Sequence, residues 1–222
     1  SIPFPKTWFI DKPEHLNISL TNLTYPIVLK PGKSWVEQDG SWLHTDVRFA
    51  NNSEQYKTIL ESDPAFYNHP YMIQDRVDGI GQGVFALYNK GNPIAFFSHK
   101  RLREKPPWGG VSVLSESVSV NPILLEHAKA LLDSVKWHGI AMVEFKVADD
   151  GTPYLMEINT RFWGSLQLSI DAGVDFPWLL YKTACGIPVE PVQNYKIGKR
   201  LRWILGDIDS LYISLRQKDN NF

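Results

Sequence analysis

Two segments of the chain decide the fold, Met-Val-Glu-Phe-Lys-Val at residues 142–147 and Tyr-Leu-Met-Glu-Ile-Asn at residues 154–159. They lie on either side of Asp-Asp-Gly at 149–151, and this arrangement predicts an antiparallel hairpin. If the last two turn residues form a two-residue loop, the numbers of facing residues add to 301. Glu144 then faces Glu157, and both side chains point to the same side of the sheet.

Asn159 lies two residues beyond Glu157 and points to the same face. Facing like charges destabilise a sheet, so the two glutamates need a counter-charge. Mg²⁺ supplies it with few protein ligands, because it keeps water and nucleotide phosphates in its shell. Glu144, Glu157 and Asn159 are therefore candidate metal ligands, and Arg161 at the next even step could neutralise phosphoryl charge. The alternative is a solvent-facing strand in which Lys146 and Arg161 balance the glutamates.

A second cationic group ends another strand. Lys30 closes an apolar run at 25–30, where its long side chain can lean over the sheet end toward an anion, unless it is simply solvated. Two common phosphate motifs are excluded by spacing. Ile27 stands where a Walker loop needs its first glycine, and Val84 takes the place of the last glycine of the dinucleotide fingerprint.

Three more groups that can carry positive charge alternate along one predicted strand. His99, Arg101 and Arg103 are expected on one face, with Lys100 and Glu104 on the other. Such a face suits a polyphosphate or carboxylate ligand. A sheet edge guarded by charge is the equally simple alternative.

The composition is that of an ordinary globular domain. The 222 residues include 23 Lys+Arg and 24 Asp+Glu, so the net charge of −1 gives no field for nucleic acid or anionic membrane binding. The single cysteine, Cys185, excludes an internal disulfide and a cysteine-based zinc site, and no apolar run approaches membrane-spanning length. We expect a soluble protein of a reducing compartment, the cytoplasm. Because the chain starts at Ser1 and ends in a polar stretch, we expect a piece of a longer protein.

Strands and helices are expected in mixed order. Strands are predicted at 25–30, 71–77, 83–88, 93–101, 140–148 and 152–158, and helices from about 52, 121, 165, 175 and 207. Residues 33–51 have no clear period and are expected to be loop with some strand. Helices and strands do not alternate strictly, which favours an α+β fold with antiparallel sheets.

The order of these features resembles the ATP-grasp superfamily. The residues that carry the resemblance are Lys30 at a strand end, Gln-Asp-Arg-Val at 74–77, His-Lys-Arg-Leu-Arg-Glu at 99–104, Glu-Phe-Lys at 144–146 and Met-Glu-Ile-Asn-Thr-Arg at 156–161. The version here looks like carbamoyl-phosphate-synthase-like predicted carboxylate–amine ligases. The resemblance implies two α+β subdomains that clamp ATP, at residues 1–72 and 73–205, with a C-terminal helical segment at 206–222.

The resemblance also implies roles for single residues. Lys30 matches the lysine that holds the α- and β-phosphates, and Gln74 to Val77 matches the adenine hinge. In that hinge Gln74 approaches the adenine amino group, while the backbone of Asp75 and Val77 pairs with the base edge. Gln82 matches the ribose position, where relatives usually carry an acid. Arg101 and Arg103 match the basic residues that contact the triphosphate or the substrate.

Glu144, Glu157 and Asn159 match the family's ligands for Mg²⁺ or Mn²⁺, and Arg161 matches the arginine that steadies the transferred phosphoryl group. The implied function is an ATP-dependent ligase that converts a small carboxylate into an acyl phosphate, which an amine or similar nucleophile attacks. Two alternatives are an inactive nucleotide-binding or regulatory module and a biotin-carboxylase-like enzyme.

Overall fold

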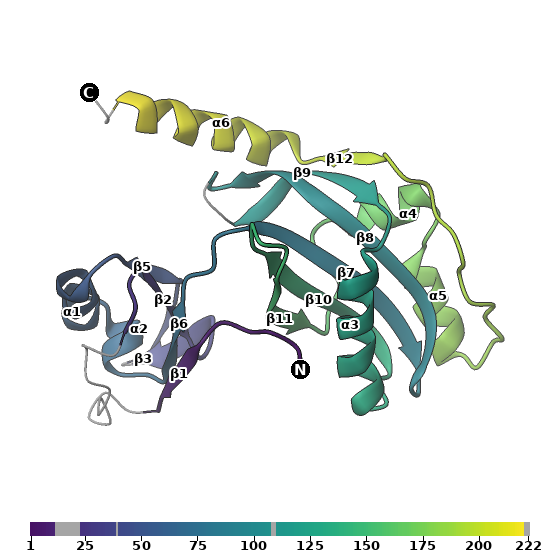
Figure 1. Cartoon of the computed structure of the whole chain (residues 1–222), viewed down its shortest axis with the longest axis horizontal. Helices are drawn as coiled ribbons and strands as arrows, with labels where there is room; N and C mark the ends of the chain where they lie inside the picture. The colour runs from purple at the N-terminus through teal and green to yellow at the C-terminus, as the bar shows by residue number, and fades with distance from the viewer. Residues whose placement is uncertain (12–22, 39, 108–109, 220–222) are drawn as a thin grey trace. The chain divides into compact units, whose positions relative to one another are not determined.

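The computed structural model describes residues 1–11, 23–38, 40–107 and 110–219 (Figure 1). The chain forms two compact units, Phe4–Asp78 and a larger one made of Ser1–Pro3 and Gly79–Phe222. The division falls after Asp78 and not after residue 72. The reason is that strand β6, Tyr71–Asp75, pairs along its whole length inside the smaller unit.

The smaller unit is built on an antiparallel sheet of four strands in the order β1-β6-β2-β5. These strands and the other elements of the unit are β1 (Thr7–Ile10), β2 (Ile27–Pro31), β5 (Arg48–Ala50), the hairpin β3 (Trp35–Gln38) and β4 (Ser41–His44), and helices α1 (Ser53–Ser62) and α2 (Pro64–Tyr67). Helix α1 begins where expected because the side chain of Asn52 accepts a hydrogen bond from the backbone N–H of Gln55. Ile27, Leu29 and Ile73 of the sheet pack with helical side chains into one core.

The larger unit is built on an antiparallel sheet of six strands in the order β11-β10-β7-β8-β9-β12. The strands are β7 (Ile80–Asn89), β8 (Asn92–Lys105), β9 (Val111–Val118), β10 (Gly139–Val147), β11 (Pro153–Asn159) and β12 (Arg200–Arg202). The predicted hairpin of β7 and β8 is confirmed, with Asn89 facing Asn92 at its closed end. Strands β9 and β12 were not predicted.

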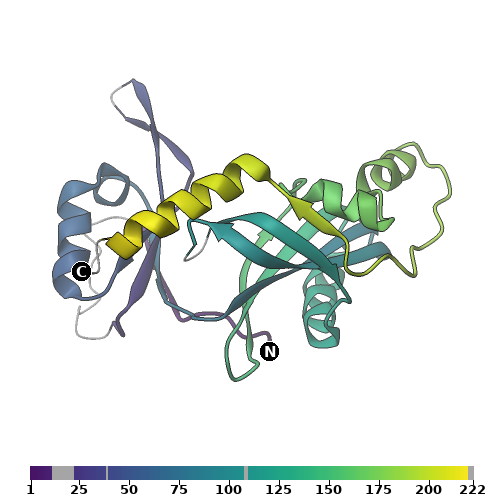
Figure 2. The ribbon, with the colours of Figure 1, turned by 90° about the horizontal axis from the view of Figure 1, so that it is seen from above.

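Helices cover both faces of this six-stranded sheet. Figure 2 shows α3 (Pro122–Ser134) on one side and α4 (Leu166–Ala172) with α5 (Phe176–Ala184) on the other. Alternate residues of β7 therefore enter two different cores. Val84 packs in the core of α3, and Phe85 packs in the core of α4 and α5. The face that carries Phe85 also carries the candidate site.

The hairpin of β10 and β11 brings Glu144 opposite Glu157, as predicted, but its turn and register differ from those assumed. The turn is longer than two residues, because the backbone N–H of Ala148 donates to the carbonyl of Thr152 at 3.0 Å. Near the turn the register is accordingly shifted by one, so that Phe145 faces Leu155. A bulge between Glu144 and Phe145 shifts the register back and restores the predicted pair.

Helix α6 (Ile204–Asp219) ends the described chain and packs along β8 and β9. Its first turn is held by the buried carboxylate of Asp207, which accepts hydrogen bonds from Arg103 and Arg202. The predicted C-terminal helical segment is thus a helix that starts at Ile204. No helix in the described ranges is long and apolar enough to span a membrane.

Candidate active site

A cavity of about 560 Å³ opens over the face of the large sheet that carries Phe85. Its lining combines the predicted acidic site with residues of β8, β9, β12 and the segment after β11. The lining side chains used below are His99, Arg101, Ser112, Ser115, Glu144, Glu157, Asn159, Arg161, Trp163, Ser165, Leu201 and Trp203. All belong to the larger unit.

The acidic end of the cavity is the Glu144–Glu157 pair with Asn159. The side chain of Glu144 is 17% exposed, so a carboxylate there needs a partner. The amide nitrogen of Asn159 donates to Glu157 Oε1 at 2.6 Å, which leaves the amide oxygen of Asn159 as a further acceptor. The three residues that the sequence predicted as metal ligands therefore line one cavity.

Arg101 supplies the counter-charge for Glu144. Its Nη2 donates to Glu144 Oε1 at 2.6 Å, and its Nη1 donates at 3.2 Å both to Glu104 Oε1 and to the carbonyl of Gly110. To reach Glu144 on β10, the side chain crosses β7, which lies between the two strands. Gly81 of β7 lies beside this path, and a Cβ there would be in ordinary van der Waals contact with Arg101 Nη1, at 3.8 Å.

The pKa of Glu144 is raised above its usual range. Burial is the main cause; Arg101 opposes the rise, and the facing Glu157 adds to it. The ion pair with Arg101 therefore does not fully compensate the loss of water around this carboxylate.

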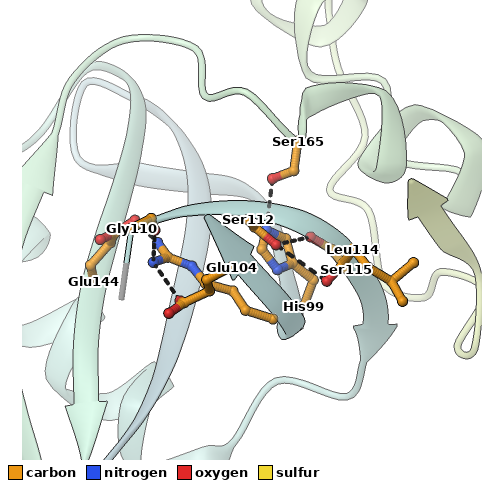
Figure 3. Close-up of polar contacts among 9 residues, drawn as sticks. His99, Glu104, Gly110, Ser112, Leu114, Ser115, Glu144 and Ser165 are labelled. Carbon is orange, nitrogen blue, oxygen red and sulfur yellow. Dashed lines mark hydrogen bonds and ion pairs between the residues drawn. The ribbon is translucent and has the colours of Figure 1, made fainter. Parts of the chain in front are cut away.

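His99 lies beside Arg101 on the same face and is 4% exposed. Its ring stacks on Phe85 with centroids 4.7 Å apart, and its Nε2 lies 2.7 Å from Ser165 Oγ (Figure 3). Burial first, and then the charge of Arg101, lower the pKa of His99 to about 3. The imidazole is therefore neutral near pH 7, and it cannot serve as the cation that the sequence pattern allowed.

Arg103 does not line the cavity, although its sequence position predicts that it does. Strand β8 is irregular on both sides of Arg103, and these bulges break the expected alternation. Arg103 instead donates from Nε and Nη2 to the two carboxylate oxygens of Asp207, both at 2.6 Å. The same irregularity brings Glu104, expected on the opposite face, into contact with Arg101.

Gln82 is also absent from the cavity lining of the described chain. It faces Lys100 and Phe145 on the neighbouring strands, whereas the adjacent Gly83 faces Glu144. Because successive strand residues point to opposite faces, Gln82 points away from the face that carries Glu144.

The predicted hinge lies in the smaller unit. Gln74 is 8% exposed, and its Nε2 donates to Thr7 Oγ1 at 3.0 Å, while its Oε1 is buried without a hydrogen-bond partner among the described residues. The backbone N–H of Asp75 donates to the carbonyl of Lys6, so the backbone group of Asp75 that can meet a base is its carbonyl. Val77 follows the end of β6, and Lys30 of β2 faces the residue Met72 of β6.

Several lining residues were not singled out from the sequence. Ser112 and Ser115 belong to β9, whose alternation of valine and serine is a weak strand signal. Ser165 and Trp163 follow Arg161 in the segment before α4, and only their nearness to that arginine could have suggested a role. Trp203 precedes α6 and had no distinguishing signal.

The acidic end fits a hard cation by the chemistry of its donors. Glu144, Glu157 and Asn159 offer carboxylate and amide oxygens, which suit Mg²⁺ and leave room for water and phosphate. Within the described ranges no cluster of three or more histidine, cysteine, aspartate or glutamate side chains could hold a metal ion. The predicted set, with two acids and one amide, is smaller than such a cluster.

Solved structures share this fold at low sequence identity. N5-carboxyaminoimidazole ribonucleotide synthetase in complex with ADP has a TM-score of 0.66 and 15% identity, over 90% of this chain and 51% of that one. L-amino acid ligase from Bacillus licheniformis has a TM-score of 0.60 and 17% identity, over 85% and 45%. The biotin carboxylase domain of 2-oxoglutarate carboxylase from Hydrogenobacter thermophilus, with MgADP, ADP and bicarbonate, has a TM-score of 0.63 and 15% identity, over 90% and 46%.

The chain thus spans about half the length of the solved relatives that it matches. No curated protein sequence matches it. The shared architecture, two α+β units with antiparallel sheets, is the ATP-grasp fold. Within this class, the family model described as ATP-grasp in the biosynthetic pathway with Ter operon matches residues 70–206, more than half of the chain. The chain belongs to that family.

Proposed function

We propose that this chain is the ATP-binding part of a ligase that activates a carboxylate as an acyl phosphate for attack by an amine or a similar nucleophile. One observation carries the proposal. Glu144, Glu157, Asn159 and Arg161 line a single cavity in a member of the ATP-grasp family. A site for carboxylate activation needs this combination of oxygen ligands for a metal and a cation for phosphoryl oxygens.

The proposed reaction has two steps. A carboxylate oxygen of the substrate attacks the γ-phosphorus, the bond from that phosphorus to the bridging oxygen breaks, and ADP leaves. The amine nitrogen then attacks the carbonyl carbon, the bond from carbon to the phosphate oxygen breaks, and phosphate leaves as the nitrogen loses a proton. Mg²⁺ or Mn²⁺, when bound, neutralises phosphate charge.

Glu144, Glu157 and Asn159 are assigned to hold that metal through their side-chain oxygens. Arg161 is assigned to the γ-phosphoryl oxygens, where charge develops during transfer. Among the described residues the guanidinium of Arg161 donates one hydrogen bond, to the carbonyl of Phe162 at 3.2 Å, and this neutral contact leaves most of its donors for a ligand.

The nucleotide contacts are assigned to residues of the smaller unit. The buried Oε1 of Gln74 and the carbonyl of Asp75 are acceptors for the adenine amino group, and the N–H of Val77 is a donor for a ring nitrogen. Lys30 is assigned to the α- and β-phosphates. The orphaned Oε1 of Gln74 supports this assignment, because a buried acceptor without a partner costs stability that a ligand donor would recover.

Arg101 is assigned to the triphosphate once a metal takes over the charge of Glu144. Arg103 and Gln82 have no part in the proposal. Asp207 accepts hydrogen bonds from Nε and Nη2 of Arg103, and Gln82 faces away from the acidic end.

The test is MgATP-dependent ADP release by the purified chain with a panel of carboxylic acids, with hydroxylamine added to trap the acyl phosphate as a hydroxamate. The proposal predicts ADP and hydroxamate in equal amounts, both abolished by Glu157→Gln. MgATP binding without acid-dependent ADP release would favour the inactive regulatory module. ADP release that requires bicarbonate, without hydroxamate from other acids, would favour the biotin-carboxylase-like alternative.

A further inference from the structure

The cavity has a second end that the metal and phosphate assignments do not use. It is walled by β8, β9, β12 and the segment before α4, and three of its polar residues are serines. Ser112 Oγ and Ser115 Oγ lie 2.7 Å apart, and Ser165 Oγ lies 2.7 Å from the His99 ring (Figure 3). Leu201 and Trp203 add apolar surface. We call these six residues the serine end of the cavity.

His99 fixes the position of Ser165. The imidazole is buried and stacked on Phe85, so its ring cannot turn freely, and the 2.7 Å contact holds the Ser165 hydroxyl in place. A hydroxyl carries one donor and two acceptor sites, and His99 uses one of them in either tautomer. Ser165 therefore keeps hydrogen-bonding capacity for a ligand.

The six side chains of the serine end carry no charge near pH 7. His99 is neutral near pH 7 because its pKa is far below that of a solvated imidazole. Arg101 is engaged by Glu144 and Glu104, and once a metal is bound it is assigned to the triphosphate. Among the described lining residues this leaves Arg161 as the cation that can meet a ligand carboxylate. A second charged group on the ligand would be desolvated at the serine end without a partner, which is costly.

One buried ring nitrogen beside the serine end has no hydrogen-bond partner in the described chain. It is Nε1 of Trp163, which lines the cavity with 5% of its surface exposed. An indole nitrogen can only donate, and buried N–H donors are rarely left unpaired. This orphaned donor points to a ligand that brings a hydrogen-bond acceptor to this end of the cavity.

We propose that the serine end binds the acceptor substrate, and that this substrate is a small monocarboxylic acid whose remaining polar group is uncharged, such as a hydroxyl. Its carboxylate lies toward Arg161 and the acidic end, its hydroxyl meets Ser165, and its carbon atoms contact Leu201 and Trp203. This inference rests on the proposed ligase function and adds the class of its substrate. Ser165 is a specificity-determining residue in this arrangement, and His99 is a positioning residue.

The test uses the hydroxamate assay with matched acids that differ by one group. The pairs are lactate with propionate and 3-hydroxybutyrate with butyrate, and the charged comparisons are succinate and β-alanine. We expect the hydroxy acids to have the highest kcat/KM. Ser165→Ala should lower kcat/KM for a hydroxy acid about tenfold, mainly through KM, and leave its deoxy partner unchanged. Ser165→Thr keeps the hydroxyl and should keep the preference.

Ser134→Ala is the matched control, because Ser134 is exposed on α3, which covers the opposite face of the sheet. An equal loss for both members of a pair in Ser165→Ala would show a merely structural role and overturn the proposal. So would succinate or β-alanine as the best substrate, or no hydroxamate from any hydroxy acid in a protein that binds MgATP. A protein that does not bind MgATP would overturn the proposed function together with this inference.

Discussion

Arg101 Nη2 donates to Glu144 Oε1 at 2.6 Å, across an intervening strand, so an arginine neutralises one of the two glutamates assigned to the metal. The side chains of both partners are largely buried, at 25% and 17% exposure. A cation already present at a metal ligand competes with the metal for that ligand. Under the proposed function, binding of metal and release of Arg101 toward the triphosphate are two parts of one exchange.

Arg101→Met tests this competition. Without nucleotide, the variant should bind Mn²⁺ more tightly than the parent, by about tenfold or roughly 1.4 kcal/mol, because the carboxylate of Glu144 loses its resident cation. Its affinity for ATP should fall, because the triphosphate loses a contact. Titration followed by electron paramagnetic resonance at pH 8 measures the free Mn²⁺. Lys100→Met is the control, since Lys100 pairs with Glu116 and does not line the described cavity. Weaker or unchanged Mn²⁺ binding in Arg101→Met would contradict the exchange.

Arg161→Ala should separate turnover from binding. If Arg161 meets the phosphoryl group mainly during transfer, kcat should fall by about a hundredfold or more while the Kd of MgATP changes little. Arg200→Ala is the control, because Arg200 pairs with Glu116 at 2.5 Å and is exposed. Initial-rate kinetics beside calorimetry gives both numbers. Equal losses in rate and affinity would mean that Arg161 only binds the ground state.

His99 should make the protein sensitive to acid. Its pKa falls from the usual 6.5 to about 3 on folding. Between these two pH values the imidazole of the unfolded chain is protonated, whereas that of the folded chain is not. The stabilisation is complete above pH 6.5 and is lost as the pH falls toward 3. Between pH 7 and 4.5 the loss is roughly 2 to 3 kcal/mol. His99→Gln should remove this part of the pH dependence in urea unfolding, and His138→Gln, at an exposed histidine, should not. An unchanged acid dependence in His99→Gln would show that His99 is not buried as a neutral group.

Asp207 should hold the start of α6. Its carboxylate accepts from Arg103 and Arg202, and Arg103 first and then Arg202 lower its pKa by hydrogen bonding. Asp207→Asn should therefore speed amide hydrogen exchange in α6 while the rest of the six-stranded sheet keeps its protection. Asp209→Asn, which loses an exposed pair with Lys105, is the control. Equal exchange rates in the two variants would remove this role of Asp207.

The facing of Glu144 and Glu157 could be predicted from the sequence, although the assumed turn was wrong. Alternation and the Asp-Asp-Gly turn identify a hairpin, but turn length and bulge position depend on local backbone geometry that residue types do not determine. A longer turn and a bulge shift the register by one residue each, in opposite senses, and the predicted pair survives.

The bulges in β8 had no such compensation. Strict alternation along β8 predicted Arg101 and Arg103 on one face and Glu104 on the other. Because the pairing of β8 is irregular, Arg103 instead binds Asp207 of α6, and Glu104 binds Arg101. Ser165 was missed for another reason. Its partner His99 is 66 positions earlier in the chain, and contacts at that separation follow from the fold and not from local pattern.

A calorimetric titration of the chain with MgATP, beside Glu157→Gln and Lys30→Ala, shows whether these residues hold the nucleotide and its metal. We predict saturable binding that requires magnesium and weakens at least tenfold in both variants. Glu126→Gln, at an exposed glutamate of α3, should bind like the parent. Absence of binding by the folded protein, or binding that Glu157→Gln leaves unchanged, would overturn the proposed ATP site.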